Sequence, residues 1–401
     1  MQRLKNAWWR LKIWKQLQTS SLRELRKRAT IRPIFWTLPL FLAGLVMYAL
    51  ALWGAPRMLA VDDLAAATPE ARLVAAHNAR LLTVSIAGAL VVGAGLLYTA
   101  RNYRLAHRGQ VTDRFAKALE RLGSSELYIR IGGIRALDHV MRDSADHYLD
   151  CVEVLSSFIR ERAPRANNRD DSSPTIYPRP ILPAEPFADV QAAFTALAHR
   201  PTKREVERHL LDFRNLHLRS LNLRDAQLDD ADFSGSDLQD SNLSGATARF
   251  AVFDATNLRE ASFYSARMEG ARFANSRLSG ANMSGIQLAN AHLVEANLEG
   301  ANLYRANLFS ANLRRADLRA AKLREVNFSY AGLRSADLRR ADLTDAQLTS
   351  ADLSNSTLHF SSLAGANIHD ANLTGARMQN ALLSYAEEEA ENGPETIDPG
   401  N

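Results

Sequence analysis

The side chains best suited to chemistry are two histidines that lie among carboxylates, His139 and His147. The neighbouring carboxylates belong to Asp138, Asp143 and Asp146. Such a group could form a metal site or an acid/base pair. We expect helix capping and surface solvation instead, because no third ligand, nucleophile or glycine-rich phosphate loop accompanies them. The lone cysteine, Cys151, excludes an internal disulfide and is interpreted as a small core residue.

A second group of side chains could bind a partner. The stretch between residues 314 and 340 contains eight Lys or Arg and only three acids, and two aromatic residues precede it. Arginine beside an aromatic ring is a combination favoured at protein interfaces. The hypothesis is a contact with an acidic protein or anionic lipid; an ordinary solvated face is the alternative. The candidate partner-binding patch consists of Tyr304, Phe309, Arg314, Arg315, Arg319, Arg324, Arg334, Arg339 and Arg340.

A five-residue repeat must position this patch. Steps of five from Phe213 to Leu383 give 35 central positions, of which 34 are Leu, Phe, Met or Ile, and only Ala248 departs. A small residue generally lies two positions earlier, which predicts that both positions point inward from a short extended side. A period of five fits neither a helix nor an unbroken strand, so a corner must follow each side. Eight glycines occupy the second position after a centre, where a corner can use permissive backbone angles.

The pattern Ala-Asp/Asn-Leu-x-x, as in Ala296-Asn297-Leu298, resembles that of the pentapeptide-repeat proteins. The resemblance implies an all-β right-handed quadrilateral β-helix with four repeats per coil. At about 4.8 Å per coil, the 175 residues from 211 to 385 would form nearly nine coils and a rod of about 40 Å. The sequence 110–164, which includes Arg130-Ile131-Gly132-Gly133-Ile134, resembles the helical region of bacterial membrane-anchored members. Asp and Asn before the centres are expected to form hydrogen bonds at the corners.

Two stretches of twenty uncharged residues, 34–53 and 81–100, predict two transmembrane helices before the repeats. The basic amphipathic arm, 1–33, holds ten Lys or Arg against one acid, whereas the charges of the loop 54–80 balance. By the positive-inside rule the loop is extracytoplasmic and both termini are cytoplasmic, in a two-pass protein of a bacterial-type inner membrane.

The remaining segments connect the membrane to the solenoid. Amphipathic periodicity predicts a cytoplasmic helical domain over 101–163 with breaks at 123–125 and 143–144. Six prolines between 164 and 186 predict a linker over 164–188. A capping helix is expected within 189–210, because an uncovered solenoid end would aggregate. An acidic, disordered tail, 386–401, follows the β-helix and holds six acids and no base.

These features predict a non-enzymatic, membrane-anchored scaffold without metal or cofactor. Its expected partners are the lipid bilayer and an unidentified, acidic cytoplasmic protein; direct nucleic-acid binding is not expected, and oligomer formation is compatible with the sequence. A first alternative is a transmembrane signalling or stress-response component whose outer loop senses a signal. A second is DNA mimicry, by which some soluble relatives protect topoisomerases. The nearly neutral repeat region, with 19 acids and 18 Lys or Arg, speaks against the second.

Overall fold

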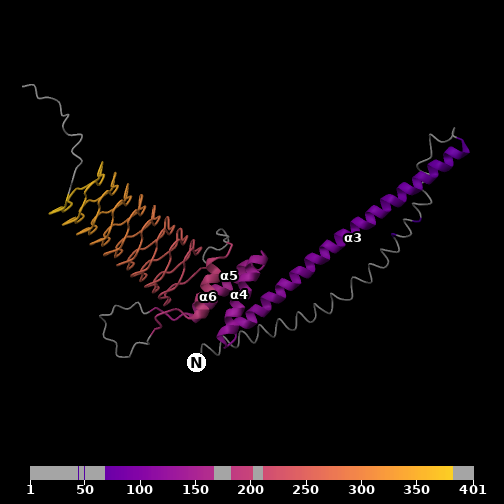
Figure 1. Cartoon of the computed structure of the whole chain (residues 1–401), viewed down its shortest axis with the longest axis horizontal. Helices are drawn as coiled ribbons and strands as arrows, with labels where there is room; N and C mark the ends of the chain where they lie inside the picture. The colour runs from indigo at the N-terminus through magenta and orange to yellow at the C-terminus, as the bar shows by residue number, and fades with distance from the viewer. Residues whose placement is uncertain (1–43, 45–48, 50–67, 167–181, 202–210, 383–401) are drawn as a thin grey trace, which may run out of the picture. The chain divides into compact units, whose positions relative to one another are not determined.

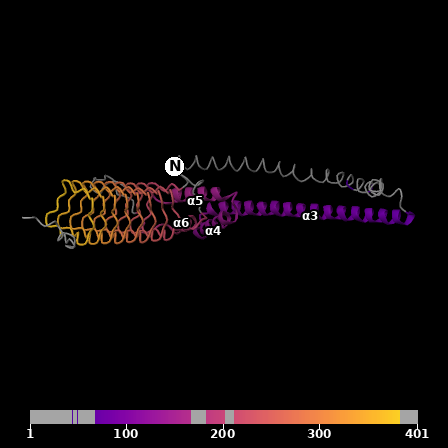
Figure 2. The ribbon, with the colours of Figure 1, turned by 90° about the horizontal axis from the view of Figure 1, so that it is seen from above.

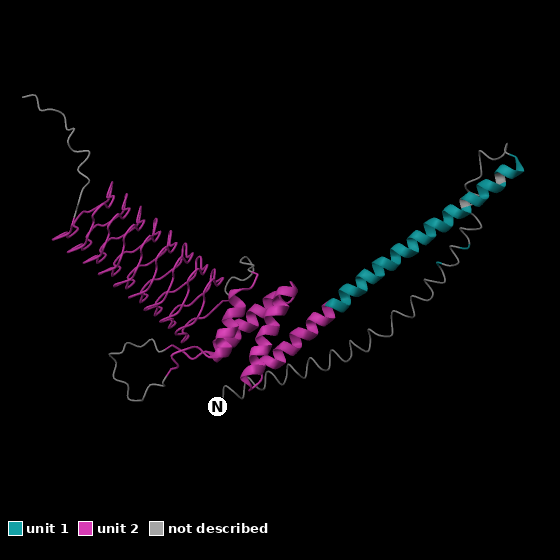
Figure 3. Ribbon diagram, in the orientation of Figure 1, with its two compact units in different colours: residues 1–107 teal, residues 108–401 magenta. Residues whose placement is uncertain are grey.

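A computed structural model describes residues 44, 49, 68–166, 182–201 and 211–382 of the 401-residue chain. It divides into two compact units, 1–107 and 108–401 (Figure 3). Helices α3 to α6 precede a stack of short coils over residues 211–382 (Figure 1).

Helix α3, Pro69–Leu122, contains the apolar stretch 81–100 and is the one described helix that is long and apolar enough to cross a membrane. The large apolar side chains of the stretch 81–100 are exposed; Leu90, Val91 and Leu97 are 68%, 71% and 75% accessible. The first expected span, 34–53, lies outside the described residues except for Gly44 and Ala49.

Residues 69–80 of the expected extracytoplasmic loop 54–80 are helical and open α3. Proline suits the first turn of a helix, and Glu70 favours its positive end. The alanine-rich sequence that follows has high helix propensity. Residues 54–67 lie outside the described residues.

Three further helices form the neck, defined here as α4 to α6 and the end of α3. Helix α4 spans Leu127–Asp143, α5 spans Tyr148–Arg162 and α6 spans Ala188–Ala198. Their breaks coincide with the polar residues at 123–125 and 144. Side chains at helical spacing, including Leu137, Met141 and Leu155, are fully buried and form the neck core.

A buried ion pair joins the neck helices. The Asp189 carboxylate of α6 is fully buried and accepts hydrogen bonds from Arg130 of α4 at 2.8 Å and Arg162 of α5 at 2.9 Å. Burial alone would raise the pKa of Asp189, but the two arginines outweigh it and hold that pKa below its ordinary value. The carboxylate therefore couples three helices through charge-assisted hydrogen bonds.

The described ends of the linker, 164–166 and 182–187, lie along the first coil. The Pro164 carbonyl accepts a hydrogen bond from the His217 amide, and the Ala166 amide donates to the Asn215 carbonyl. The His217 ring also lies 2.8 Å from the Pro183 carbonyl. The backbone groups of these ends thus form hydrogen bonds with the β-helix, which the proline content did not predict. Residues 167–181 are outside the described residues.

The coils of 211–382 stack side by side (Figure 2), and their parallel bridges have a register of twenty residues. Asp212 bridges Asp232, which bridges Val252, and the same step continues to the bridge between Ser362 and Leu382. The central residue and the small residue two positions earlier are buried in nearly every repeat, so the interior is filled by side chains. Four five-residue sides per coil confirm the quadrilateral β-helix.

Each corner places its second residue in the left-handed region. All 34 such positions from 215 to 380 have φ between +53° and +72°, and 26 of them are not glycine. Carboxylate and amide side chains stabilise these corners: the Asp212 and Asn302 side chains accept the amide hydrogens of the residues two positions later. The expected corner role of Asp and Asn is confirmed.

A column of phenylalanines connects the neck to the interior. Phe194 of α6 lies 4.8 Å from the Phe213 ring, and centroid distances of 5.2, 5.3 and 5.0 Å continue the column through Phe233, Phe253 and Phe273. Because Phe194 is also 1% accessible, α6 covers the apolar end of the first coil. It thereby shields a surface that would otherwise be exposed.

Candidate partner-binding surface

The nine candidate residues occupy all four corners of the β-helix. We number the corners in chain order through one coil, so that they carry residues 314–315, 319–320, 324–325 and 329–330. The twenty-residue register stacks Arg314 with Arg334 at the first corner and Arg319 with Arg339 at the second, as the repeat predicted. Tyr304 lies at the third corner and Phe309 at the fourth. The candidate residues therefore surround the rod and do not form a single face.

Acidic neighbours neutralise much of the second corner. Arg319 contacts Asp317 at 2.7 Å and Glu299 at 3.0 Å, and Arg339 contacts Asp337 at 2.5 Å. Burial alone would raise the pKa of Asp337, but hydrogen bonds from Arg339 outweigh it and hold that pKa below its ordinary value. These two guanidinium groups would have to leave existing partners before they bound a new one.

The third corner holds a compact ion-pair cluster. Arg305 contacts Glu325 at 2.7 Å and lies 4.9 Å from the Tyr304 ring centroid, while the Tyr304 hydroxyl donates to Glu325 at 3.1 Å. The hydrogen bond from Arg305 is the main cause of the lowered pKa of Glu325. Arg324 lies 3.8 Å from Asp345. Tyr304 is thus engaged by Arg305 on its own coil and by Glu325 on the next coil.

The first corner carries the uncompensated charge. Arg315 contacts Glu295 at 3.1 Å, but within 286–350 no acid lies within 4 Å of Arg314 or Arg334. The same is true of Arg340 at the second corner. Arg334 acts on Asp352 only through space: a hydrogen bond from Ser354 lowers the pKa of Asp352, and the charge of Arg334 adds to this shift. The basic character of the patch is therefore concentrated at these three arginines.

The fourth corner holds an aromatic pair that sequence reasoning identified only in part. The centroids of the Phe309 and Tyr330 rings are 5.4 Å apart and the ring planes are inclined at 65°, with the side chains 40% and 59% accessible. Tyr330 was missed, although a twenty-residue step from Ser310 places it on the coil next to Phe309. Solvent-exposed rings of this kind are suited to an interface.

The residues first considered for chemistry have structural neighbours. His147 stacks on Phe115 at 5.1 Å, and its Nε2 lies 3.2 Å from the Thr112 hydroxyl. Cys151 is fully buried, and burial raises the pKa of its thiol to about 12, with the charge of Asp150 adding to the shift. Among the described residues, no group of three or more His, Cys, Asp or Glu is placed to hold a metal ion.

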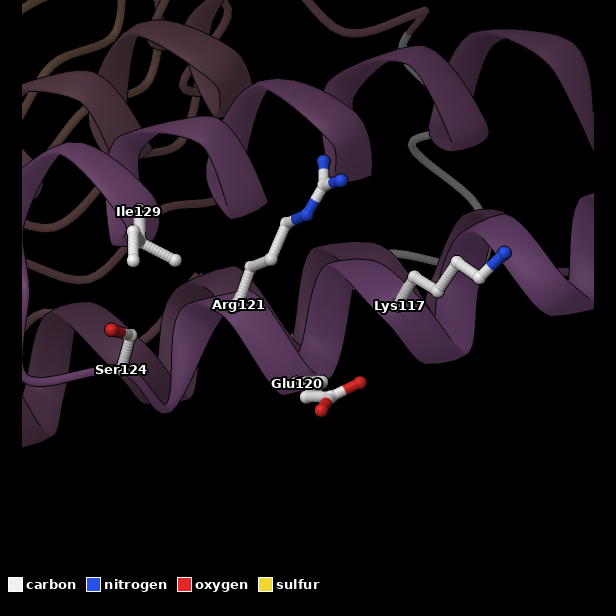
Figure 4. A pocket seen from close by; sticks show the side chains of 5 residues that line it. All are labelled: Lys117, Glu120, Arg121, Ser124 and Ile129. Atoms are coloured by element: carbon white, nitrogen blue, oxygen red, sulfur yellow. The ribbon is translucent and has the colours of Figure 1, made fainter.

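A hollow of about 420 Å³ lies on the neck beside the end of α3. Its lining residues are Lys117, Glu120, Arg121, Ser124 and Ile129. Figure 4 shows that the charged side chains project in different directions and do not converge on one point. Lys117 also contacts Asp113 at 2.8 Å. The hollow therefore lacks the convergent polar groups typical of a small-molecule site.

Comparison with known proteins identifies the repeat region. The pentapeptide repeats family model matches in eight copies, over residues 211–245, 241–280, 271–308, 281–319, 301–340 and 341–380. No curated protein matches the chain. Among solved structures, the chain is similar to HetL, a pentapeptide repeat protein involved in heterocyst differentiation regulation from the cyanobacterium Nostoc sp. strain PCC 7120. They are 31% identical, with 43% of this chain and 87% of HetL covered and a TM-score of 0.30.

Two further solved structures show lower identity. Full-length QnrB1, a plasmid-mediated fluoroquinolone resistance protein, is 18% identical, with 43% of this chain and 93% of QnrB1 covered and a TM-score of 0.23. Rfr23, a pentapeptide repeat protein from the cyanobacterium Cyanothece 51142, is 21% identical, with 45% and 94% covered and a TM-score of 0.21. The family match shows that the chain belongs, through its repeat region, to the pentapeptide repeat proteins.

Proposed function

We propose that the protein is a non-enzymatic scaffold that holds a rigid β-helix at the cytoplasmic face of a membrane for an acidic protein partner. The observation that carries the proposal is the filled interior of the coils, in which inward residues such as Leu298 and Leu318 are fully buried. Such a rod offers outward columns in fixed register but no internal chamber. Solenoids of this kind act through extended binding surfaces.

The exposed apolar stretch of α3 supports membrane attachment. Twenty helical residues extend about 30 Å, the thickness of a hydrocarbon core. Arg101, Arg104 and Arg108 follow this stretch, and Tyr98 and Tyr103 lie at its end. This order suits a helix whose C-terminal end faces the cytoplasm.

Cysteine accessibility tests the attachment and the orientation. We would introduce His77→Cys before the apolar stretch and His107→Cys after it, and treat intact cells with a membrane-impermeant maleimide. Cys151 should stay unlabelled because it is buried. Labelling at 77 alone, with retention of the protein in carbonate-washed membranes, is the expected result. Release by carbonate, or labelling at 107 in intact cells, would refute the proposed attachment or its orientation.

Proximity labelling in the native host tests the partner contact. The double variant Arg314→Glu/Arg334→Glu reverses charges that lack acidic partners, so it should abolish recovery of a protein enriched at the rod. A matched control, Arg224→Glu/Arg259→Glu, changes the net charge equally at distant coils and should retain recovery. Equal recovery from both variants would show that the first corner is not the binding site.

The same measurement separates the alternatives. Recovery of a topoisomerase as the main partner would favour DNA mimicry, against the nearly neutral charge of the rod. A phenotype that depends on the outer loop while rod variants have no effect would favour signalling. Exchange of the loop for an unrelated uncharged sequence, without loss of phenotype, would exclude that sensing role.

A further inference from the structure

One strip of the β-helix carries no charge over four stacked segments, which is the longest such run on the described coils. It consists of the outward side chains of the segments 286–290, 306–310, 326–330 and 346–350, which the twenty-residue register stacks on one side and its fourth corner. We call it the uncharged strip. The charged residues Arg267 and Glu269 precede it, and Asp370 follows it. The strip spans three coil spacings, or about 14 Å.

Amide side chains form the flat part of the uncharged strip. Asn307 donates its amide hydrogen to Gln287 at 3.2 Å, and Asn327 donates to Asn307 at 3.3 Å. Asn and Gln each carry both donors and an acceptor, so a stacked row still offers both kinds of group outward. Such a surface can form hydrogen bonds with an identical surface.

The aromatic pair lies at the edge of this amide row. Phe309 and Tyr330 provide exposed apolar area, and Ser329, Ser310 and Thr349 surround them without charge. The core of a protein interface is typically enriched in aromatic residues and depleted of charged ones, and a polar rim surrounds it. Rings with few rotatable bonds also lose little conformational entropy on binding.

The other three corners of these coils carry charge, and the third holds the ion pairs of Arg305 with Glu325 and of Arg324 with Asp345. The first corner stacks Arg314 with Arg334, and the second stacks Arg319 with Arg339. In a two-fold interface the same patch is present on both subunits, so Arg314 and Arg334 of the first corner, unpaired within 286–350, would approach their own copies. Like-charge contacts of this kind oppose association. Among the described coils from 286 to 350, the fourth corner is the one without charge.

We propose that the uncharged strip is a contact between two copies of this chain. Two copies in one membrane have the same polarity, which allows a two-fold axis along the membrane normal with equivalent coils at the same level. Because the strip is only about 14 Å long, its contact should bury less surface than a standard interface, which buries about 800 Å² per partner. The contact is therefore weak in dilute solution and is populated through the high local concentration in the membrane. In this respect the inference rests on the proposed membrane attachment.

Disulfide crosslinking in native membranes tests this contact. The variants Ser310→Cys and Ser329→Cys place thiols beside the aromatic pair, and Ser279→Cys at the second corner is the matched control. A disulfide requires Cα atoms within about 7 Å, so dimer formation reports close approach of the two strips. The buried Cys151 should not compete for oxidation. We expect a covalent homodimer from the fourth-corner cysteines and at least tenfold less from Ser279→Cys.

Added charge should remove the contact. Phe309→Glu/Tyr330→Glu, introduced with Ser310→Cys, should reduce the homodimer at least tenfold, and Thr349→Glu should act similarly without removing a ring. Circular dichroism of the purified variants checks that the coils are retained. Equal crosslinking at Ser279, or no homodimer at either fourth-corner site, would overturn the proposal. A covalent adduct with a different protein would assign the strip to another partner, and carbonate extraction of the same samples reports membrane attachment separately.

Discussion

Gly133 sits where α4 crosses the end of α3, and replacing it with alanine should destabilise the neck. A Cβ atom at 133 would lie 2.8 Å from the Leu122 amide nitrogen and 2.9 Å from the Ala118 carbonyl oxygen. Both are backbone atoms, so relief requires that the helices separate. At the adjacent Gly132, a Cβ atom would meet nothing within 4 Å. Gly132→Ala is therefore a matched control in the same helix.

The two variants share the gain in helix propensity, which is about 1 kcal/mol for Gly→Ala in a helix interior. Overpacking at Gly133 should cost about 1–3 kcal/mol in addition. The difference between the two free energies of opening should thus be about 1–3 kcal/mol, which corresponds to roughly 5- to 150-fold in the exchange rates of protected amides.

Hydrogen exchange followed by mass spectrometry on the full chain in lipid nanodiscs measures this difference directly. Peptides from α4 and the end of α3 should exchange faster in Gly133→Ala than in Gly132→Ala, while those from the β-helix should not change. Equal protection in the two variants would refute the close helix approach on which the prediction depends.

Three further predictions concern the cap, the corners and the buried ion pair. Phe194→Ala should destabilise the first coils by about 3–5 kcal/mol. Phe360→Ala removes a ring that is 61% accessible and should have little effect. Similar rates of amide hydrogen exchange in the two variants would contradict capping by α6. Gly300→Ala should lower the free energy of unfolding by about 1–2 kcal/mol because of its positive φ alone, since a Cβ atom there would meet nothing within 4 Å. Gly332→Ala, at a position without positive φ, should be nearly neutral. Equal thermal stability of the two variants would contradict the left-handed corner. Asp189 has a lowered folded-state pKa, so its contribution is complete above the unfolded value of about 4 and is lost as pH falls through the folded value. Asp189→Asn should destabilise the neck at pH 7 and reduce its acid sensitivity, and an unchanged pH profile of neck exchange would show that this carboxylate is not responsible.

Sequence periodicity predicted the β-helix well because contacts in a solenoid are local in register. Each inward residue meets residues twenty positions away, so one repeated pattern specifies the coil, the corner and the stack. The alignment of Arg314 with Arg334 followed from this register alone. Membrane attachment stays a prediction.

The charge state of the candidate patch could not be read in the same way. Arg319 and Arg314 occupy equivalent positions in successive repeats, yet acids lie beside Arg319 and none lies within 4 Å of Arg314. The difference depends on side chains at two, eighteen or twenty positions away, and on the direction in which each guanidinium extends. A count of charges between 314 and 340 therefore overestimated the basic surface available to a partner.

Residue types and their spacing specify the repeat, its filled interior, its nearly neutral charge and the apolar stretch of α3. Three-dimensional packing is needed to bring Arg130 to Asp189 across 59 positions of non-repeating sequence, and to lay the linker ends along the first coil. It also decided which arginines lack acidic partners and that Phe309 pairs with Tyr330. These contacts depend on how helices pack and where side chains extend, and no period in the sequence encodes either.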